Sequence, residues 1–150
     1  MSYVERAVDQ MVDIIGGLGD ELASRRPGLP GANSPYAILR HCLGVMGFWG
    51  GQVVAGRTIE RDREAEFEAT GSIASLVVAA QQTKDTFRAD ATAADPGAPP
   101  RGPHPGTSPD ELELLSQGSA LLHVLEEVTQ HLGQMELTRD SLQDGRLAAS

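Results

Sequence analysis

The stretch LLHVLEEVTQH, residues 121–131, carries a metal-capable side chain at every fourth position: His123, Glu127 and His131. In an α-helix this spacing places all three on one face, with Cβ atoms four residues apart lying about 5–6 Å from each other. Zinc–nitrogen bonds of about 2.0–2.1 Å and zinc–oxygen bonds of about 2.0–2.2 Å can span that gap, so two neighbours could share one ion. One ion could not easily be reached by all three, because His123 and His131 lie two turns apart. The stretch therefore predicts a helix that supplies two ligands of a metal site.

Four segments of the chain show the apolar periodicity of helices in a bundle. Two of them have clear start signals: Ser34 is a cap followed by Pro35 at the first helical position, and Ser72 caps the third segment. The predicted helices span about residues 3–24, 35–56 and 73–89, and the fourth begins between 109 and 118 and continues to about 142.

The links between these helices differ in composition. Residues 57–71 are charge-dense and bounded by glycines, which predicts a long crossover between the second and third helices. Residues 93–109 hold most of the prolines, which predicts a linker without regular structure before the fourth helix. Four helices with one apolar stripe each are buried most simply as an all-α four-helix bundle, a single domain of residues 1–150. The long crossover permits an up-down-down-up order.

Composition narrows the classes of function. The net charge of −9 and the presence of only one lysine, Lys84, argue against a nucleic-acid surface, which needs clustered basic residues. No apolar run approaches the 18 residues that suggest a membrane span. The single cysteine, Cys42, cannot form an internal disulfide, and the N-terminus does not resemble a signal peptide. We therefore expect a cytoplasmic protein.

His41 is the candidate ligand from another helix. It follows Ile38 by three residues and precedes Val45 by four, beside the apolar stripe, so we expect it to face the bundle interior and to need a partner there. Two histidines and a carboxylate from two helices are the composition of an open metal site, with a position left for water or substrate. The alternatives are that the histidines are satisfied core groups and that Glu127 is a solvated surface carboxylate.

Three neighbouring polar residues are expected to lie outside the metal site. Glu126 lies about 100° around the helix from Glu127, so we expect it to face solvent or to support a ligand. Cys42 diverges from His41 by the same angle and is predicted to be a small core residue rather than a nucleophile. His104 stands between two prolines of the linker and is expected to be solvated.

Much of the chain resembles the DinB-like superfamily of metal-binding four-helix bundles. The segments that carry the resemblance are HCLGVMGFW at 41–49, RDREAEF at 61–67, HVLEE at 123–127 and HLGQ at 131–134. It covers nearly the whole chain except the proline-rich linker, and it is closest to the branch of mycothiol-dependent maleylpyruvate isomerase and the mycothiol S-transferases. The resemblance implies an up-down-down-up bundle whose metal is held by His41, Glu127 and His131. His123 then falls outside the ligand set and, with Gln134, becomes a candidate to support the ligands.

The resemblance also implies a chemistry. A divalent ion, expected to be zinc although nickel, iron or manganese suit the same donors, would bind the sulfur of a low-molecular-weight thiol such as mycothiol. The charge of the ion deprotonates a coordinated thiol, and the thiolate can then add to an electrophile. The expected function is a metal-dependent thiol S-transferase or isomerase that needs no protein nucleophile. The alternative is a non-catalytic, stress-associated metal-binding bundle that acts through a partner or as a homodimer.

Two arginines of the crossover are candidates for binding substrate. Arg61 and Arg63 could anchor an anionic electrophile, because a guanidinium group pairs with a carboxylate through two hydrogen bonds. The alternative, expected for at least one of them, is a salt bridge to Asp62 or Glu64 within the same loop.

Overall fold

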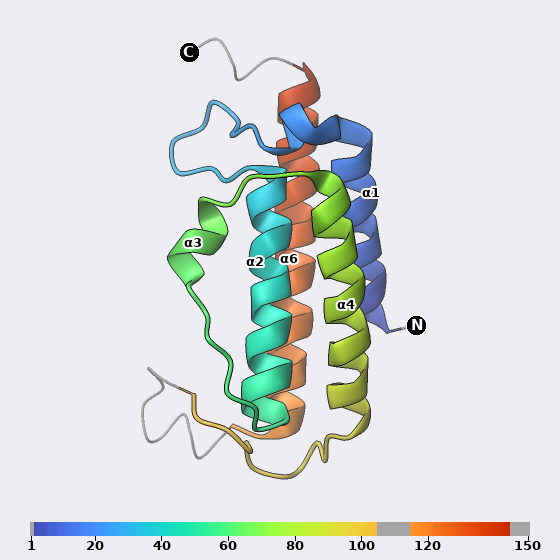
Figure 1. Cartoon of the computed structure of the whole chain (residues 1–150), viewed down its shortest axis with the longest axis vertical. Coiled ribbons are helices and arrows are strands. Elements are labelled where there is room, and N and C mark those ends of the chain that lie inside the picture. Colours follow the sequence, from blue (N-terminus) through green and yellow to red (C-terminus); the bar gives the residue numbers. More distant parts are fainter. Residues whose placement is uncertain (1, 105–114, 145–150) are drawn as a thin grey trace.

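The computed structural model describes residues 2–104 and 115–144, which form helices and connecting loops without a strand among them. The long helices lie side by side, roughly parallel to the longest axis of the molecule (Figure 1). The elements are α1 (Tyr3–Ala23), α2 (Pro35–Met46), η1 (Gly47–Val54), α3 (Arg63–Phe67), α4 (Ile73–Thr92) and α6 (Gln117–Asp144). The predicted all-α class is confirmed.

Short polar residues begin the long helices where the sequence predicts. The hydroxyl of Ser2 accepts a hydrogen bond from the backbone of Glu5, whose carboxylate accepts one from the backbone of Ser2 in return. The hydroxyls of Ser34 and Ser72 accept from the third residue beyond each of them, and Pro35 occupies the first position of α2. Each cap satisfies a backbone N–H group that has no partner within the helix. The third predicted helix, which is α4, continues to Thr92, three residues past its predicted end.

The second predicted helix changes its winding after Met46. Residues 47–54 continue it as the π-helix η1, a rare geometry that is frequent at functional sites. Glycines are weak helix formers, and three of the first five residues of η1 are glycine. Gly50 is also required sterically, because a Cβ atom there would lie 2.7 Å from a ring carbon of Phe87. The apolar pattern predicted the helix but not this change of winding.

The hydrophobic core lies between the long helices. The apolar residues that recur at intervals of three or four along the first three predicted helices are buried or half-buried. The buried ones are Val4, Val8, Met11, Ile15, Leu18, Ile38, Cys42, Val45, Val53, Leu76, Ala80 and Phe87. Leu22, Trp49 and Ile73 are partly buried and pack against the core.

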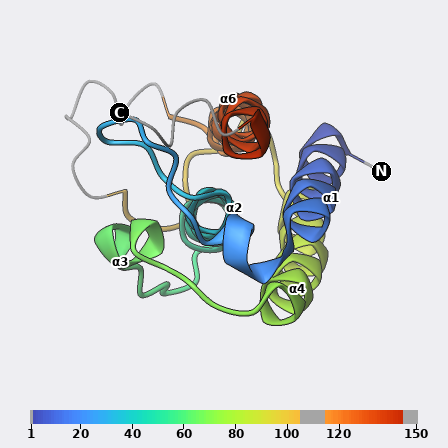
Figure 2. The same cartoon turned by 90° about the horizontal axis from the view of Figure 1, so that it is seen from above.

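The crossover between η1 and α4 packs against the bundle. It contains α3, which the sequence pattern did not predict and whose first turn is capped by the Asp62 carboxylate at 3.0 Å from the backbone nitrogen of Ala65. α3 contacts α2 and lies on the side of α2 away from α4 (Figure 2). Glu66 is the buried residue of α3. The crossover therefore delivers a carboxylate to the surface of α2.

The described part of the proline-rich linker folds back onto the helix ends. It has no regular structure, as predicted, and residues 105–109 lie outside the described residues. The backbone nitrogen of Arg101 donates to the carbonyl of Val53 at 2.9 Å, and the side-chain amide of Gln52 donates to the carbonyl of Pro103 at 2.9 Å. α6 then begins at Gln117, within the predicted window. None of the helices in the described ranges is both long and apolar enough to cross a membrane.

We predict that Glu5→Gln removes a part of the stability that depends on pH. The hydrogen bond from the backbone of Ser2 is the largest cause of the lowered pKa of Glu5; burial opposes it, and Arg88 lowers the pKa further. A carboxyl with a lowered folded-state pKa stabilises the fold above its unfolded pKa, and that contribution is lost as pH falls through the folded value. Urea unfolding should show a loss of about 1–3 kcal/mol at pH 7.

The difference between wild type and Glu5→Gln should shrink below about pH 4, near the unfolded pKa of glutamate. Glu21→Gln is the matched control, because Glu21 is an exposed glutamate of the same helix with a side chain 84% exposed. A constant difference from pH 7 to pH 3 would contradict the role given to Glu5.

Candidate metal centre

Three side chains from α2 and α6 converge in the bundle. His41 comes from α2, and Glu127 and His131 lie one turn apart on α6; one ligand atom from each lies within 4.8 Å of the others. Nε2 of His41 is 3.6 Å from Oε2 of Glu127, and Nε2 of His131 is 3.8 Å from the same oxygen. The structure thus brings together the three residues selected from the sequence, and their role as ligands stays a prediction.

The cluster fits a divalent cation. His41 is 2% exposed, as its position beside the apolar stripe predicts, and its Nε2 atom has no hydrogen-bond partner among the described residues. A buried polar atom without a partner destabilises a fold, whereas a metal ion would satisfy its lone pair. Two donors bound to one zinc ion at tetrahedral angles are about 3.4 Å apart. The separations of 3.6 and 3.8 Å from the Glu127 oxygen are close to that value, and the full set of atoms, within 4.8 Å of one another, needs a further closure between the two histidines.

The other face of His41 contacts the crossover. Its Nδ1 atom lies 3.0 Å from Oε2 of Glu66, and its ring stacks on Phe67 with centroids 4.4 Å apart. Arg61 donates to both oxygens of Glu66, at 2.8 and 2.9 Å. Burial alone would raise the pKa of Glu66, but the hydrogen bonds with His41 and Arg61 outweigh it and hold the pKa below its ordinary value. Glu66 and Phe67 were not predicted from the sequence.

The remaining histidine of the cluster contacts its own helix. Nδ1 of His131 lies 2.8 Å from the side-chain oxygen of Gln134, one turn further along α6. The ring of His131 meets the ring of His41 edge-on, with centroids 4.8 Å apart. Gln134 is therefore placed to orient the ring of His131.

His123 and Glu126 lie outside the cluster. The ring of His123 packs on Trp49 with centroids 4.3 Å apart, and its Nδ1 atom is 3.8 Å from Glu126. The side chain of Glu126 is 64% exposed, against 28% for Glu127. The helical angle between the two glutamates predicted this difference.

A cavity of about 430 Å³ opens beside the cluster and has the size of a small-molecule site. One side is formed by aromatic and imidazole rings, here called the aromatic wall: Phe48, Trp49, His104 and His123. The expectation that His104 is solvated is wrong, because the linker folds back and places its ring 4.3 Å from that of Trp49. The other lining residues are His41, Val45, Arg61, Arg63 and Glu127.

The two crossover arginines differ in their partners. Arg61 forms a salt bridge within the crossover, as expected, but its partner is Glu66. The expected partners, Asp62 and Glu64, were wrong. Arg63 lies over the ring of Phe67, 5.5 Å from the centroid, and lines the cavity. Within the described part of the chain, no ion pair to an acidic residue is found for Arg63.

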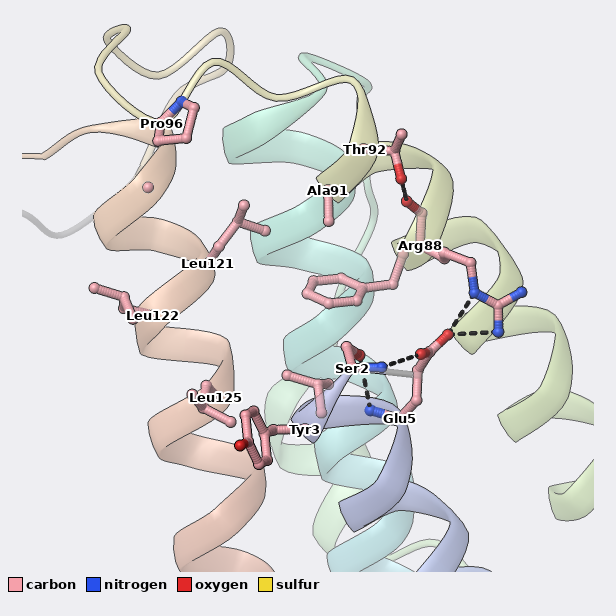
Figure 3. A pocket seen from close by; sticks show the side chains of 13 residues that line it. Ser2, Tyr3, Glu5, Arg88, Ala91, Thr92, Pro96, Leu121, Leu122 and Leu125 are labelled. Atoms are coloured by element: carbon pink, nitrogen blue, oxygen red, sulfur yellow. Dashed lines mark hydrogen bonds and ion pairs between the residues drawn. The ribbon is translucent and has the colours of Figure 1, made fainter.

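A larger cavity of about 680 Å³ lies elsewhere, between α1, α4 and α6 (Figure 3). Its walls are mostly apolar, with Phe87, Leu121 and Leu125 among them, and its charged groups, Glu5 and Arg88, pair with each other. Within residues 2–104 and 115–144, no histidine or cysteine lines this cavity. The groups capable of metal chemistry therefore belong to the smaller cavity.

Cys42 is a core residue, as predicted. Its side chain is fully buried, and burial raises the pKa of its thiol strongly, with smaller contributions from the negative charges of Glu127 and Glu66. A thiol is nucleophilic as a thiolate, so Cys42 is not suited to attack a substrate.

A known protein family matches almost the whole chain. The model of the family described as mycothiol S-transferase matches residues 1–144. The chain belongs to the mycothiol S-transferase family. This confirms the resemblance to the mycothiol branch of the DinB-like superfamily. No match was found among curated proteins or among solved structures.

We predict that the thiol of this mycothiol S-transferase family member is protected in the native state. Cys42 is the single cysteine, so its reaction with a chromogenic aromatic disulfide can be followed without interference. The folded protein should react at least tenfold more slowly than the protein in guanidinium chloride, because the buried thiol rarely ionises. Equal rates in both states would contradict the placement of Cys42 in the core.

Proposed function

We propose that this protein is a divalent-metal-dependent thiol S-transferase or isomerase whose cosubstrate is a low-molecular-weight thiol such as mycothiol. The observation that carries the proposal is the buried, unpartnered Nε2 atom of His41, which faces Glu127 and His131 at the edge of a cavity. Membership of the mycothiol S-transferase family supports the choice of thiol.

In this proposal His41, Glu127 and His131 hold the ion. Two imidazoles and one carboxylate suit zinc, and also nickel, iron or manganese. Three protein ligands leave a position open, as in catalytic rather than structural zinc sites, and the adjoining cavity gives that position access to a substrate. The bound ion would lower the pKa of a coordinated thiol, so that the thiolate forms near neutral pH.

The protein residues around the cavity would orient the second substrate. Arg63 would anchor an anionic group of the electrophile, and the aromatic wall would shield the reacting atoms from water. In a transfer, the sulfur forms a bond to one carbon of an activated double bond, and the proton lost by the thiol ends on the neighbouring carbon. In an isomerisation, the carbon–sulfur bond forms, the adduct rotates about the new single bond, and the carbon–sulfur bond breaks again.

We also infer that the long helices follow the up-down-down-up order. The crossover supports this order, because it returns the chain from the end of η1 to the opposite end of α2, where α4 begins (Figure 1). This path carries residues 61–67 along α2 and past His41. A cytoplasmic location completes the proposal, because a thiol cosubstrate needs a reducing compartment.

We predict that wild-type protein binds about one zinc ion per chain and that His41→Ala, Glu127→Ala and His131→Ala each lose most of it. Metal content after dialysis, measured by mass spectrometry, checks this. Glu126→Ala is the matched control, because Glu126 is adjacent on α6 and its side chain is 64% exposed. Full occupancy in any of the three variants would exclude that residue as an essential ligand.

We predict that Arg63→Ala raises KM for an anionic electrophile about tenfold, because one charge-assisted hydrogen bond to the substrate is lost. KM for a neutral electrophile should stay nearly unchanged. Assays of metal-loaded protein with a panel of thiols and electrophiles would measure this by mass spectrometry of the products. Arg139→Ala is the control, since Arg139 pairs with Asp140 near the end of α6. Absence of product for every pair, with metal bound, would contradict the proposed function.

A further inference from the structure

We propose that Glu66 is a positioning residue that fixes the ring and tautomer of His41, and that Gly44 is the residue that makes room for it. The inference rests on the proposed function in one respect: the nitrogen that Glu66 positions is a proposed metal ligand. The interaction itself is independent of any metal, because it joins α2 to the crossover.

The first observation is the close approach of Glu66 to the backbone of α2. Gly44 lies one turn after His41, so the two residues share a face of the helix. A Cβ atom on Gly44 would lie 1.9 Å from Oε1 and 2.5 Å from Cδ of Glu66. Real Cβ contacts are essentially never shorter than 3.0 Å. Any side chain at Gly44 would therefore push the carboxylate from its place.

The second observation is how completely the carboxylate of Glu66 is held. Its side chain is 6% exposed, Arg61 donates to both of its oxygens, and Nδ1 of His41 lies 3.0 Å from Oε2. Nδ1 also lies 3.4 Å from Nη2 of Arg61, but that nitrogen already donates to Oε2 of Glu66 at the shorter distance of 2.9 Å. The contact with the carboxylate, which is an acceptor, therefore places the hydrogen on Nδ1. The neutral ring then carries its lone pair on Nε2.

This tautomer is the one that the cluster requires. Nε2 of His41 is the atom that lies 3.6 Å from Glu127 without a hydrogen-bond partner. Phe67, the next residue of the crossover, stacks on the His41 ring with centroids 4.4 Å apart and limits the rotation of that ring. Glu66 thus presents a lone pair to the cluster, the role that carboxylates have behind metal-binding histidines in other proteins.

Substitution of Gly44 can test this role with little damage to the fold. The atoms that a new Cβ would meet belong to the far end of the flexible Glu66 side chain rather than to backbone. Gly44→Ala should therefore keep the helix, which alanine favours over glycine, and displace the carboxylate from His41. Gly47→Ala is the matched control, one turn further along, because a Cβ atom there would meet nothing within 4 Å.

The experiment measures the affinity of the purified chain for Zn²⁺ by competition with a chromophoric chelator. Gly44→Ala and Glu66→Ala should each weaken binding about 10–100-fold, the usual effect of losing a residue that orients a metal ligand, and Gly47→Ala should leave affinity within about twofold. Glu66→Gln, which keeps an oxygen acceptor, should lose less than Glu66→Ala. Unchanged affinity in Gly44→Ala and Glu66→Ala would overturn the proposal.

A double substitution separates this mechanism from a general loss of structure. If Gly44→Ala acts by displacing Glu66, it should cause no further loss in the Glu66→Ala background, where no carboxylate remains to be displaced. Losses that add in Gly44→Ala/Glu66→Ala would show that the two residues act independently and would overturn the role given to Gly44.

Nitrogen-15 NMR of the imidazole rings gives a readout that needs no metal. At a pH where the ring is neutral, metal-free wild type should show the His41 hydrogen on Nδ1, and both Gly44→Ala and Glu66→Ala should move the ring toward a mixture of tautomers. A neutral wild-type ring with its hydrogen on Nε2, or no change in either variant, would overturn the inference. Failure of wild type to bind any metal would contradict the proposed function alone, since the NMR result would still decide whether Glu66 positions His41.

Discussion

The structure depends on how the buried imidazole of His41 is satisfied. An imidazole has two nitrogen atoms, and both need partners when water is excluded. One of them, Nδ1, lies at hydrogen-bonding distance from Glu66 of the crossover, and the other, Nε2, faces α6 without a hydrogen-bond partner. The two sides of this ring therefore link the crossover to the pair of polar residues on α6.

Three segments outside the long α-helices contribute residues to the surroundings of His41. α3 carries Glu66 and Phe67 to His41, and the π-helix η1 carries two rings of the aromatic wall, Phe48 and Trp49. The linker adds His104 to the same wall. A short α-helix, a π-helix and an irregular linker thus adjoin a cluster whose candidate ligands lie on the long helices α2 and α6. This arrangement combines rigid ligands with a cavity wall drawn from segments that can vary.

Helical periodicity predicted the long helices and the face shared by His123, Glu127 and His131, and the family resemblance selected Glu127 and His131 from that face. The periodicity also separated Glu127 from Glu126 and placed His41 inward, because both inferences need only positions along one helix. Glu66 could not be found in this way, since its burial depends on its pairing with Arg61 and on the space that Gly44 leaves on α2. A glycine one turn after an inward histidine was the one available signal. The placement of His104 likewise depends on how the linker docks on η1.

The central claim is that the cluster holds an ion with a position open to a thiol. X-ray absorption at the metal edge of zinc-loaded protein, recorded before and after addition of a low-molecular-weight thiol, tests it most directly. We expect nitrogen and oxygen ligands alone at first, and one new sulfur ligand at about 2.3 Å once the thiol is present. A spectrum that shows four protein ligands and gains no sulfur would contradict an ion with a position open to a thiol.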